Sequence, residues 1–267
     1  MNRTVLGLDA AWTAHQPSGV ALVQEQGQRW HCLAVAPSYA SFLACAEGHT
    51  VDWEARHRGS TPEMGTLLRA SARLAGRPVD LIAIDMPLST EPIGGRRNAD
   101  QQVSIQYGSR GCAVHSPTTA RPGALADGLR SELEQLGHPL QTTATPRHSS
   151  GGVLEVYPHV ALLALLGLDY RLEYKVSRSS RYWPAASIRQ RIEKLLANFQ
   201  RIQNALQQQI GTINLPLPQP AAVATLTALK PWEDSLDALV CAWVALEHLR
   251  GHTRAMGDST ATIWCPH

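Results

Sequence analysis

The stretch VDLIAIDMP, residues 79–87, decides the fold class of this 267-residue chain. Its mostly apolar run Val79–Ile84, interrupted by Asp80, has the length and the β-branched character of a buried strand, and Asp85 follows it directly. The preceding residues 61–74 place apolar side chains at helical spacing. A helix that leads into a buried strand is a crossover unit, which adds a parallel strand to a sheet. The sequence therefore predicts an α/β fold.

Three short apolar runs upstream of this unit predict an antiparallel meander. They are Thr4–Leu8, Gly19–Val23 and Trp30–Ala36, and the polar links between them favour tight turns. Downstream, Val153–Val156 predicts one more strand. We therefore expect a mixed five-stranded sheet, with three antiparallel strands followed by parallel strands, flanked by helices.

The chain is predicted to form a single domain over residues 1–267. Residues 89–150 are rich in Gly, Pro, Ser, Thr and Arg. Because long connections of this kind are usually functional, we expect an Arg-rich, mostly helical insertion there. A further helical segment, residues 158–220, ends in a proline-rich stretch, and a final helix is predicted at 232–249.

The amino-acid composition argues against several classes of protein. Hydrophobic residues make up 44% of the chain and charged residues 17%, which excludes general disorder. The net charge is only +2, so any nucleic-acid surface must be local. The five cysteines include no CxxC pair, which fits a reducing, cytoplasmic compartment and argues against a zinc ribbon. The apolar runs are too short to cross a membrane.

Acidic residues accompany the predicted parallel strands. Asp9 and Asp85 follow strand runs and Glu155 lies inside one, while Asp234 and Asp237 share one face of the last helix. Ligands bind beyond the carboxyl ends of parallel strands, so these side chains are expected to converge. Clustered carboxylates repel one another unless a cation neutralises them, and Mg²⁺ or Mn²⁺ prefers oxygen ligands. The pattern predicts metal-dependent phosphodiester hydrolysis.

Each acidic residue also has a structural interpretation. Asp9 and Asp85 are of a type common at turns that follow strands. Asp234 and Asp237 could form the cap and acidic first turn of a helix. Glu155 is harder to explain in this way, because a lone buried carboxylate is costly. The order of all five along the chain is more specific than any one of them.

A basic segment with interleaved aromatic residues runs from Arg171 to Arg201. It holds eight Lys or Arg side chains against Glu173 and Glu193, a composition that suits contacts to phosphates and bases. A solvated basic helix face is the alternative interpretation. The arginines of the insertion could also contact phosphates, or they could pair with Asp100 and Asp127. The predicted substrate-binding residues are Arg97, Arg110, Lys175, Arg178 and Arg181.

Four segments resemble a known family in sequence and in order. They are GLDAAW (Gly7–Trp12), IAIDMPL (Ile82–Leu88), LEVYPH (Leu154–His159) and DSLDALVCAW (Asp234–Trp243). They resemble the domain of unknown function 429 family, described as predicted nucleases of the ribonuclease H fold. The resemblance extends from the first strand to the last helix and implies a ribonuclease H-like fold.

The resemblance also implies roles for individual residues. Asp9, Asp85 and Asp237, with or without Asp234, would bind Mg²⁺ or Mn²⁺, and Glu155 would be a further acidic position. Residues 97–110, which include Asp100, resemble the Arg–Asp–Arg segment of the family. His159 departs from the acidic residue expected in many relatives, which puts the role of that position in doubt.

The expected function is therefore that of a metal-dependent nuclease acting on nucleic acid. A homodimer would suit the cutting of branched substrates. One alternative is an inactive ribonuclease H-like module that binds nucleic acid or a protein partner. Another is an ATPase or phosphotransferase of the actin-like superfold, although the chain is short for two such domains and lacks a second Gly-rich phosphate loop.

Overall fold

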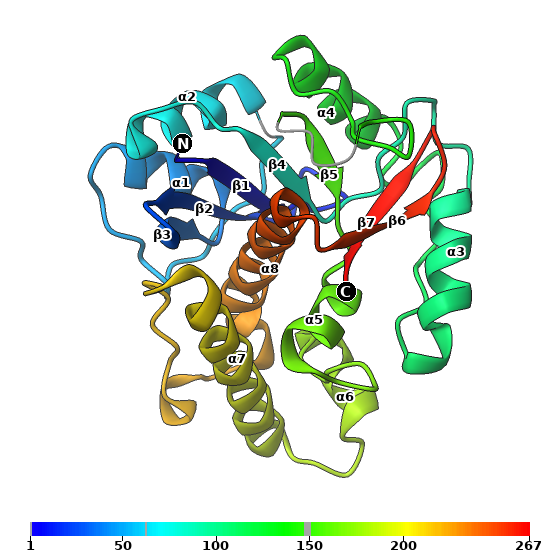
Figure 1. Cartoon of the computed structure of the whole chain (residues 1–267). Coiled ribbons are helices and arrows are strands. Elements are labelled where there is room, and N and C mark those ends of the chain that lie inside the picture. The colour runs from blue at the N-terminus through cyan, green and yellow to red at the C-terminus, as the bar shows by residue number, and fades with distance from the viewer. Residues whose placement is uncertain (1, 62, 147–150) are drawn as a thin grey trace.

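A seven-stranded mixed sheet forms the centre of the computed structural model, which describes residues 2–61, 63–146 and 151–267 (Figure 1). The strand order is β3-β2-β1-β4-β5-β7-β6. The antiparallel meander consists of β1 (Thr4–Asp9), β2 (Gly19–Gln26) and β3 (Arg29–Ala36). β4 (Leu81–Ile84) pairs in parallel with β1, and β5 (Val153–Glu155) pairs in parallel with β4. The predicted α/β class and mixed sheet are confirmed.

The predicted count of five strands is wrong, because a C-terminal hairpin adds two. β7 (Thr262–Pro266) pairs in parallel with β5, and β6 (Thr253–Gly257) pairs with β7 in the antiparallel sense. The sequence of β6, TRAMG, is short and partly polar, and three of its five residues are only half-buried. A strand of this kind gives no clear apolar run. The end of the predicted insertion, residues 147–150, lies outside the described residues.

One face of the sheet packs against three helices. Alternate strand residues such as Val5, Leu81 and Leu154 point into the core on this side, as the period of a strand requires. The helices are α5 (Pro158–Leu166), α7 (Ile188–Ile210) and α8 (Lys230–Arg250), of which α8 crosses the middle of the sheet (Figure 1).

The opposite face carries a second core. Leu6, Ile82 and Val153 point to this side, each next in sequence to a residue of the first core. The covering helices are α1 (Tyr39–Ala46), α2 (Met64–Ala75) and α4 (Ala124–Gln135). The remaining helices are α3 (Asn98–Tyr107) beside the C-terminal hairpin, α6 (Ser179–Tyr182), and the short η1 (Gly108–Arg110), η2 (Val176–Arg178), η3 (Pro220–Ala222) and η4 (Leu226–Leu229).

Two glycines let α8 approach the sheet closely. A Cβ atom on Gly7 would lie 2.1 Å from the carbonyl oxygen of Ala238, and one on Gly19 would lie 2.1 Å from that of Asp234. A side chain at either position would therefore force the helix away from β1 and β2. The close approach brings the acidic half of α8 to the carboxyl end of β1. Among the described residues, none of the helices has both the length and the apolar character needed to cross a bilayer.

Candidate functional site

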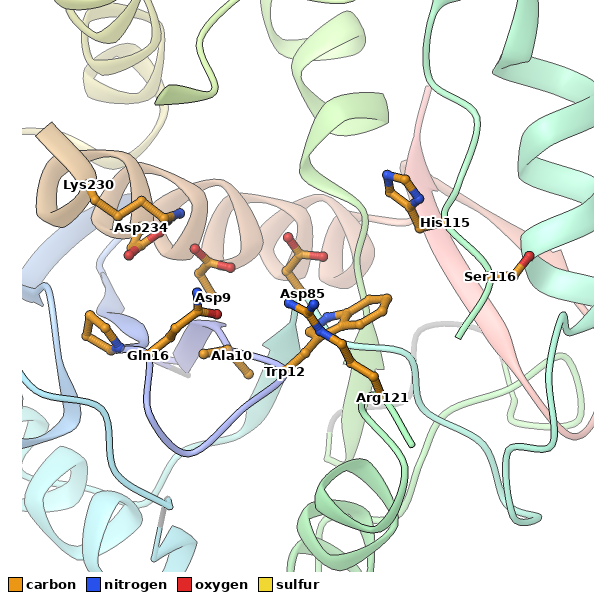
Figure 2. A pocket seen from close by; sticks show the side chains of 12 residues that line it. Asp9, Ala10, Trp12, Gln16, Asp85, His115, Ser116, Arg121, Lys230 and Asp234 are labelled. Carbon is orange, nitrogen blue, oxygen red and sulfur yellow. Dashed lines mark hydrogen bonds and ion pairs between the residues drawn. The ribbon is translucent and has the colours of Figure 1, made fainter. Parts of the chain in front are cut away.

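The ends of two parallel strands hold the first two acidic side chains. Asp9 is the last residue of β1, and Asp85 directly follows β4. The backbone N–H of Asp85 donates to the carbonyl oxygen of Leu8 at 2.9 Å, which ties the two strand ends together. Figure 2 shows Asp9 and Asp85 side by side, both directed toward α8.

Helix α8 supplies three more carboxylates, those of Glu233, Asp234 and Asp237, all of them buried. The helix begins at Lys230, so Asp234 and Asp237 lie past its first turn, and neither caps it. The Nζ atom of Lys230 donates to Glu233 Oε1 at 2.7 Å and to Asp234 Oδ1 at 2.5 Å. We name Asp9, Asp85, Glu233, Asp234 and Asp237 together the carboxylate cluster.

A second lysine reaches the cluster from the segment before η2. Lys175 Nζ donates to Asp237 Oδ2 and lies 3.6 Å from Glu233 Oε1. The neighbouring Tyr174 hydroxyl donates to Asp237 Oδ1 at 2.6 Å, and the backbone N–H of Val176 donates to Glu233 at 2.6 Å. Both oxygens of Asp237 and both oxygens of Glu233 are thus held by groups of the chain itself.

Asp9 and Asp85 differ from the α8 carboxylates. In the part of the chain that the structure describes, no hydrogen bond reaches either side-chain carboxylate. Burial, together with Asp234 and Asp237, holds the pKa of Asp9 well above its usual range. Burial raises the pKa of Asp85 to about 7, although Lys175 opposes the shift. Burial also raises that of Asp234 to about 6, against the effect of Lys230. Each of these three carboxyl groups is therefore protonated more readily than an exposed aspartate.

A pocket of about 500 Å³ opens over Asp9 and Asp85; we name it the Trp12 pocket (Figure 2). Its floor includes Asp9, Asp85 and Asp234. Its rim carries two cations, Lys230 and Arg121. The Arg121 guanidinium lies 6.0 Å from the centre of the Trp12 ring. Buried acidic oxygens therefore face an aromatic and basic rim.

A second pocket, of about 270 Å³, adjoins the Trp12 pocket; we name it the Arg171 pocket. It shares Trp12, Asp85, His115 and Lys230 with the Trp12 pocket. Its further lining residues include Glu155, His159, Arg171, Lys175, Arg178 and Glu233. Asp85 therefore stands where the two pockets meet.

Glu155 and Arg97 form a buried ion pair behind this second pocket. Two nitrogens of the Arg97 guanidinium donate to the two oxygens of Glu155, each at 2.6 Å, and one also donates to Asp100 at 2.6 Å. The backbone N–H of Leu88 donates to Glu155 as well, at 2.8 Å. The pairing of Arg97 with Asp100 is the alternative that the sequence left open. The pair joins the start of α3 to β5.

The structure gathers only part of the predicted site residues. Asp9, Asp85 and Asp234 line the Trp12 pocket, while Glu155, Lys175 and Arg178 line the Arg171 pocket. Asp237 is fully buried behind them. Arg110 donates to the backbone carbonyls of Leu168 and Asp169, and Arg181 is exposed on α6. Neither Arg110 nor Arg181 lines the two pockets.

Three residues of the site were not predicted from the sequence: Glu233 of the carboxylate cluster, and Tyr174 and Lys230, which contact the cluster. The spacing of Lys230 three residues before Glu233 and four before Asp234 is a recognisable helical pairing signal. Tyr174 offers no such signal, because 63 residues separate it from Asp237.

The described residues contain no group of three or more His, Cys, Asp or Glu side chains that could hold a metal ion as they stand. The contacts of Lys175 and Lys230 give a physical reason, since their ammonium groups bind the α8 carboxylates. Two carboxylates, Asp9 and Asp85, have no hydrogen-bond or ion-pair partner among the described residues.

Comparison with known proteins identifies one family. The family model described as "Protein of unknown function (DUF429)" matches residues 7–262. No curated protein and no solved structure matches the chain. The match covers every segment that carried the resemblance in the sequence.

Proposed function

The chain belongs to the DUF429 family, and we propose that it is a metal-dependent hydrolase that cleaves phosphodiester bonds in nucleic acid. One observation carries the proposal. Asp9 and Asp85 lie side by side at the ends of parallel strands, open into the Trp12 pocket and have no hydrogen-bond partner among the described residues. Burial disfavours their charged forms, which a divalent cation would restore.

The strand order supports a ribonuclease H-like assignment. The antiparallel β3-β2-β1 unit continues into parallel β4 and β5, which is the arrangement that the family resemblance implies. In this proposal, the β7-β6 hairpin extends the sheet beyond that unit. The carboxylates then lie at the strand ends where ligands of open α/β sheets bind.

The residues present fit a hard cation in their chemistry. Asp9 and Asp85 would hold Mg²⁺ or Mn²⁺, and Asp234 would join them when Lys230 moves away. The Lys230 side chain is 45% exposed, so it has room to leave Asp234. Asp237 would remain with Lys175 and Tyr174 and would act through its charge. A bound ion would supply charge to activate a water molecule and to stabilise the reacting phosphate.

The side chains of the chain itself perform the remaining tasks. Lys175 and Tyr174 fix the orientation of Asp237. Lys230, released from Asp234, would be close enough to contact a phosphate oxygen in the Trp12 pocket. Arg121 would contribute a second positive charge at the rim, and Trp12 an aromatic surface for a base.

Asp85→Asn tests the proposal. We expect the variant to fold, as judged by circular dichroism, and to lose Mg²⁺-dependent cleavage of nucleic acid. Asp169→Asn is the matched control, because Asp169 is exposed and lines neither pocket. Saturable Mn²⁺ binding by calorimetry should likewise disappear in Asp9→Asn/Asp85→Asn. Cleavage that survives in Asp85→Asn would contradict the assignment.

A second candidate is a metal-free scaffold that binds nucleic acid. The observation in its favour is that Lys175 and Lys230 already neutralise the carboxylates of α8. In this case the wild type would bind nucleic acid equally well in a chelator and would show no Mn²⁺ binding. The calorimetric titration therefore distinguishes the two candidates.

A further inference from the structure

The Arg171 pocket contains two guanidinium groups that have no carboxylate partner among the described residues. Arg171 Nη2 donates to His159 Nε2 at 2.6 Å, and Arg178 Nη2 donates to His115 Nε2 at 2.8 Å. An imidazole nitrogen that accepts a hydrogen bond belongs to a neutral ring. The two histidines therefore orient the guanidinium groups without cancelling their positive charge.

Among the described residues, two buried polar atoms of the side chains that line this pocket have no hydrogen-bond partner, although the Tyr182 hydroxyl lies near Arg171. They are Arg171 Nε and His159 Nδ1. Because His159 Nε2 accepts from Arg171, Nδ1 carries the ring proton, so both unpaired atoms are donors. Burial and the nearby Arg171 keep the pKa of His159 well below its usual value, in agreement with a neutral ring. Buried donors without acceptors are costly and indicate a site where an acceptor is expected.

The acidic residues of the pocket wall do not satisfy these arginines. Both oxygens of Glu155 are held by Arg97, and Glu233 is held by Lys230, Lys175 and a backbone N–H. Of the acidic residues that line the pocket, Asp85 alone has no hydrogen-bond partner among the described residues, and it also lines the Trp12 pocket. The wall that Arg171 and Arg178 form therefore keeps an excess of positive charge.

We propose that the Arg171 pocket binds a terminal phosphate monoester, either of a free nucleotide or of the end of a nucleic-acid strand. The doubly charged monoester suits two guanidinium groups that lack acidic partners. A volume of about 270 Å³ is sufficient for a phosphate and its sugar. Such a phosphate would lie beside Asp85. The inference that cleavage occurs near the end of a nucleic-acid strand rests on the proposed function. The inference that the pocket binds phosphate does not.

Calorimetric titration of the full chain with inorganic phosphate, in EDTA, tests the binding. We expect saturable binding by the wild type and a loss of about tenfold or more in affinity for Arg171→Gln and for Arg178→Gln. Arg189→Gln, on the exposed surface of α7, is the matched control and should bind as the wild type does. Among the described residues, the Arg178 side chain makes one hydrogen bond, to His115, so its variant provides a test if Arg171→Gln folds poorly. No saturable binding by the wild type, or unchanged binding by the folded arginine variants, would overturn the proposal.

Competition experiments in the same buffer identify the source of the phosphate. The competitors are a nucleoside monophosphate and a short single-stranded oligonucleotide with or without a terminal phosphate. We expect the terminal phosphate to raise the affinity of the oligonucleotide about tenfold, with the gain lost in Arg178→Gln. Equal affinity for the oligonucleotide with and without its terminal phosphate would overturn the assignment of the ligand as a phosphate monoester. Because these measurements exclude metal and require no cleavage, a failed nuclease test with intact phosphate binding would count against the proposed function alone.

Discussion

Lys175 forms an ion pair with Asp237 in the interior of the protein. The Asp237 side chain is fully buried, and the side chain of Lys175 is 18% exposed. Replacing one partner of a buried ion pair leaves the other charged and unpaired, which typically costs about 3–5 kcal/mol. We therefore expect Lys175→Met to lower the free energy of unfolding by an amount of that order, measured by urea denaturation.

The control for this prediction is the exposed pair on α7. Arg189→Met breaks the contact of Arg189 with Glu193 and should change stability by less than about 0.5 kcal/mol. Adding Asp237→Asn to Lys175→Met removes the unpaired charge and should recover part of the loss. Equal stabilities of Lys175→Met and Arg189→Met would show that Lys175 does not serve this role.

Asp85 makes the stability of the metal-free protein depend on pH, and the direction of its pKa shift fixes the sign of this dependence. Its pKa is raised to about 7 in the folded chain, above the value of about 3.9 for an unfolded aspartate. The folded state thus binds more protons than the unfolded state between these two values. The contribution of Asp85 to stability is fully present below about pH 4 and is lost as the pH rises through about 7.

We therefore expect the wild type in EDTA to lose stability relative to Asp85→Asn as the pH rises from about 4 to about 8. Urea denaturation of both proteins across this range measures the difference. In the proposed function, Mn²⁺ would compete with the proton on Asp85, so the affinity for Mn²⁺ should increase over the same interval. Parallel stability profiles for the two proteins would show that Asp85 does not titrate in this way.

At the scale of the elements, the packing of α8 on β1 sets the geometry of the site. Gly7→Ala would place a methyl group 2.1 Å from the carbonyl oxygen of Ala238. We expect it to lower the free energy of unfolding by about 1–3 kcal/mol or more. It should also weaken Mn²⁺ binding, because α8 carries Asp234 and must move away from Asp9.

Gly128→Ala is the matched control, since Gly128 lies within α4 and an added Cβ there meets no atom within 4 Å. Alanine is favoured over glycine in a helix, so this variant should be neutral or more stable by up to about 1 kcal/mol. Urea denaturation and calorimetry of the two variants measure both effects. Wild-type stability and Mn²⁺ affinity in Gly7→Ala would contradict the proposed role of this contact.

The elements differ in how far sequence could predict them. The sequence predicted β1, β4 and β5 from short, mostly apolar runs, because local pattern determines them. β6 and β7 could not be predicted in this way. Their strand character depends on pairing with each other and with β5, which is distant in sequence.

At the scale of the whole molecule, sequence predicted the acidic side of the site better than the basic side. Asp9 and Asp85 are marked by the strands that precede them. Arg97 was expected to contact substrate, yet it forms ion pairs with Glu155 and Asp100. Arg97 and Glu155 are 58 residues apart in sequence, so local pattern could not predict their contact. Whether an arginine faces solvent, a carboxylate or a pocket depends on the complete fold, so residue type and spacing could not separate these cases.

The distribution of basic residues over the molecule predicts a weak salt dependence of binding. Only three of the eight basic side chains between Arg171 and Arg201 line the Arg171 pocket, and Lys175 among them is already paired. Two guanidinium groups without carboxylate partners that contact phosphates give a slope of log K against log salt of about −1.4 for a single strand, or about −2 if Arg121 of the Trp12 pocket also contacts a phosphate, whereas eight contacts would give about −6. We expect the smaller slope for a short oligonucleotide in EDTA, measured by fluorescence anisotropy, and no change in Arg189→Gln/Lys194→Gln. A slope near the larger value would mean that the surface of α7 also binds the strand, and the binding site would then extend well beyond the two pockets.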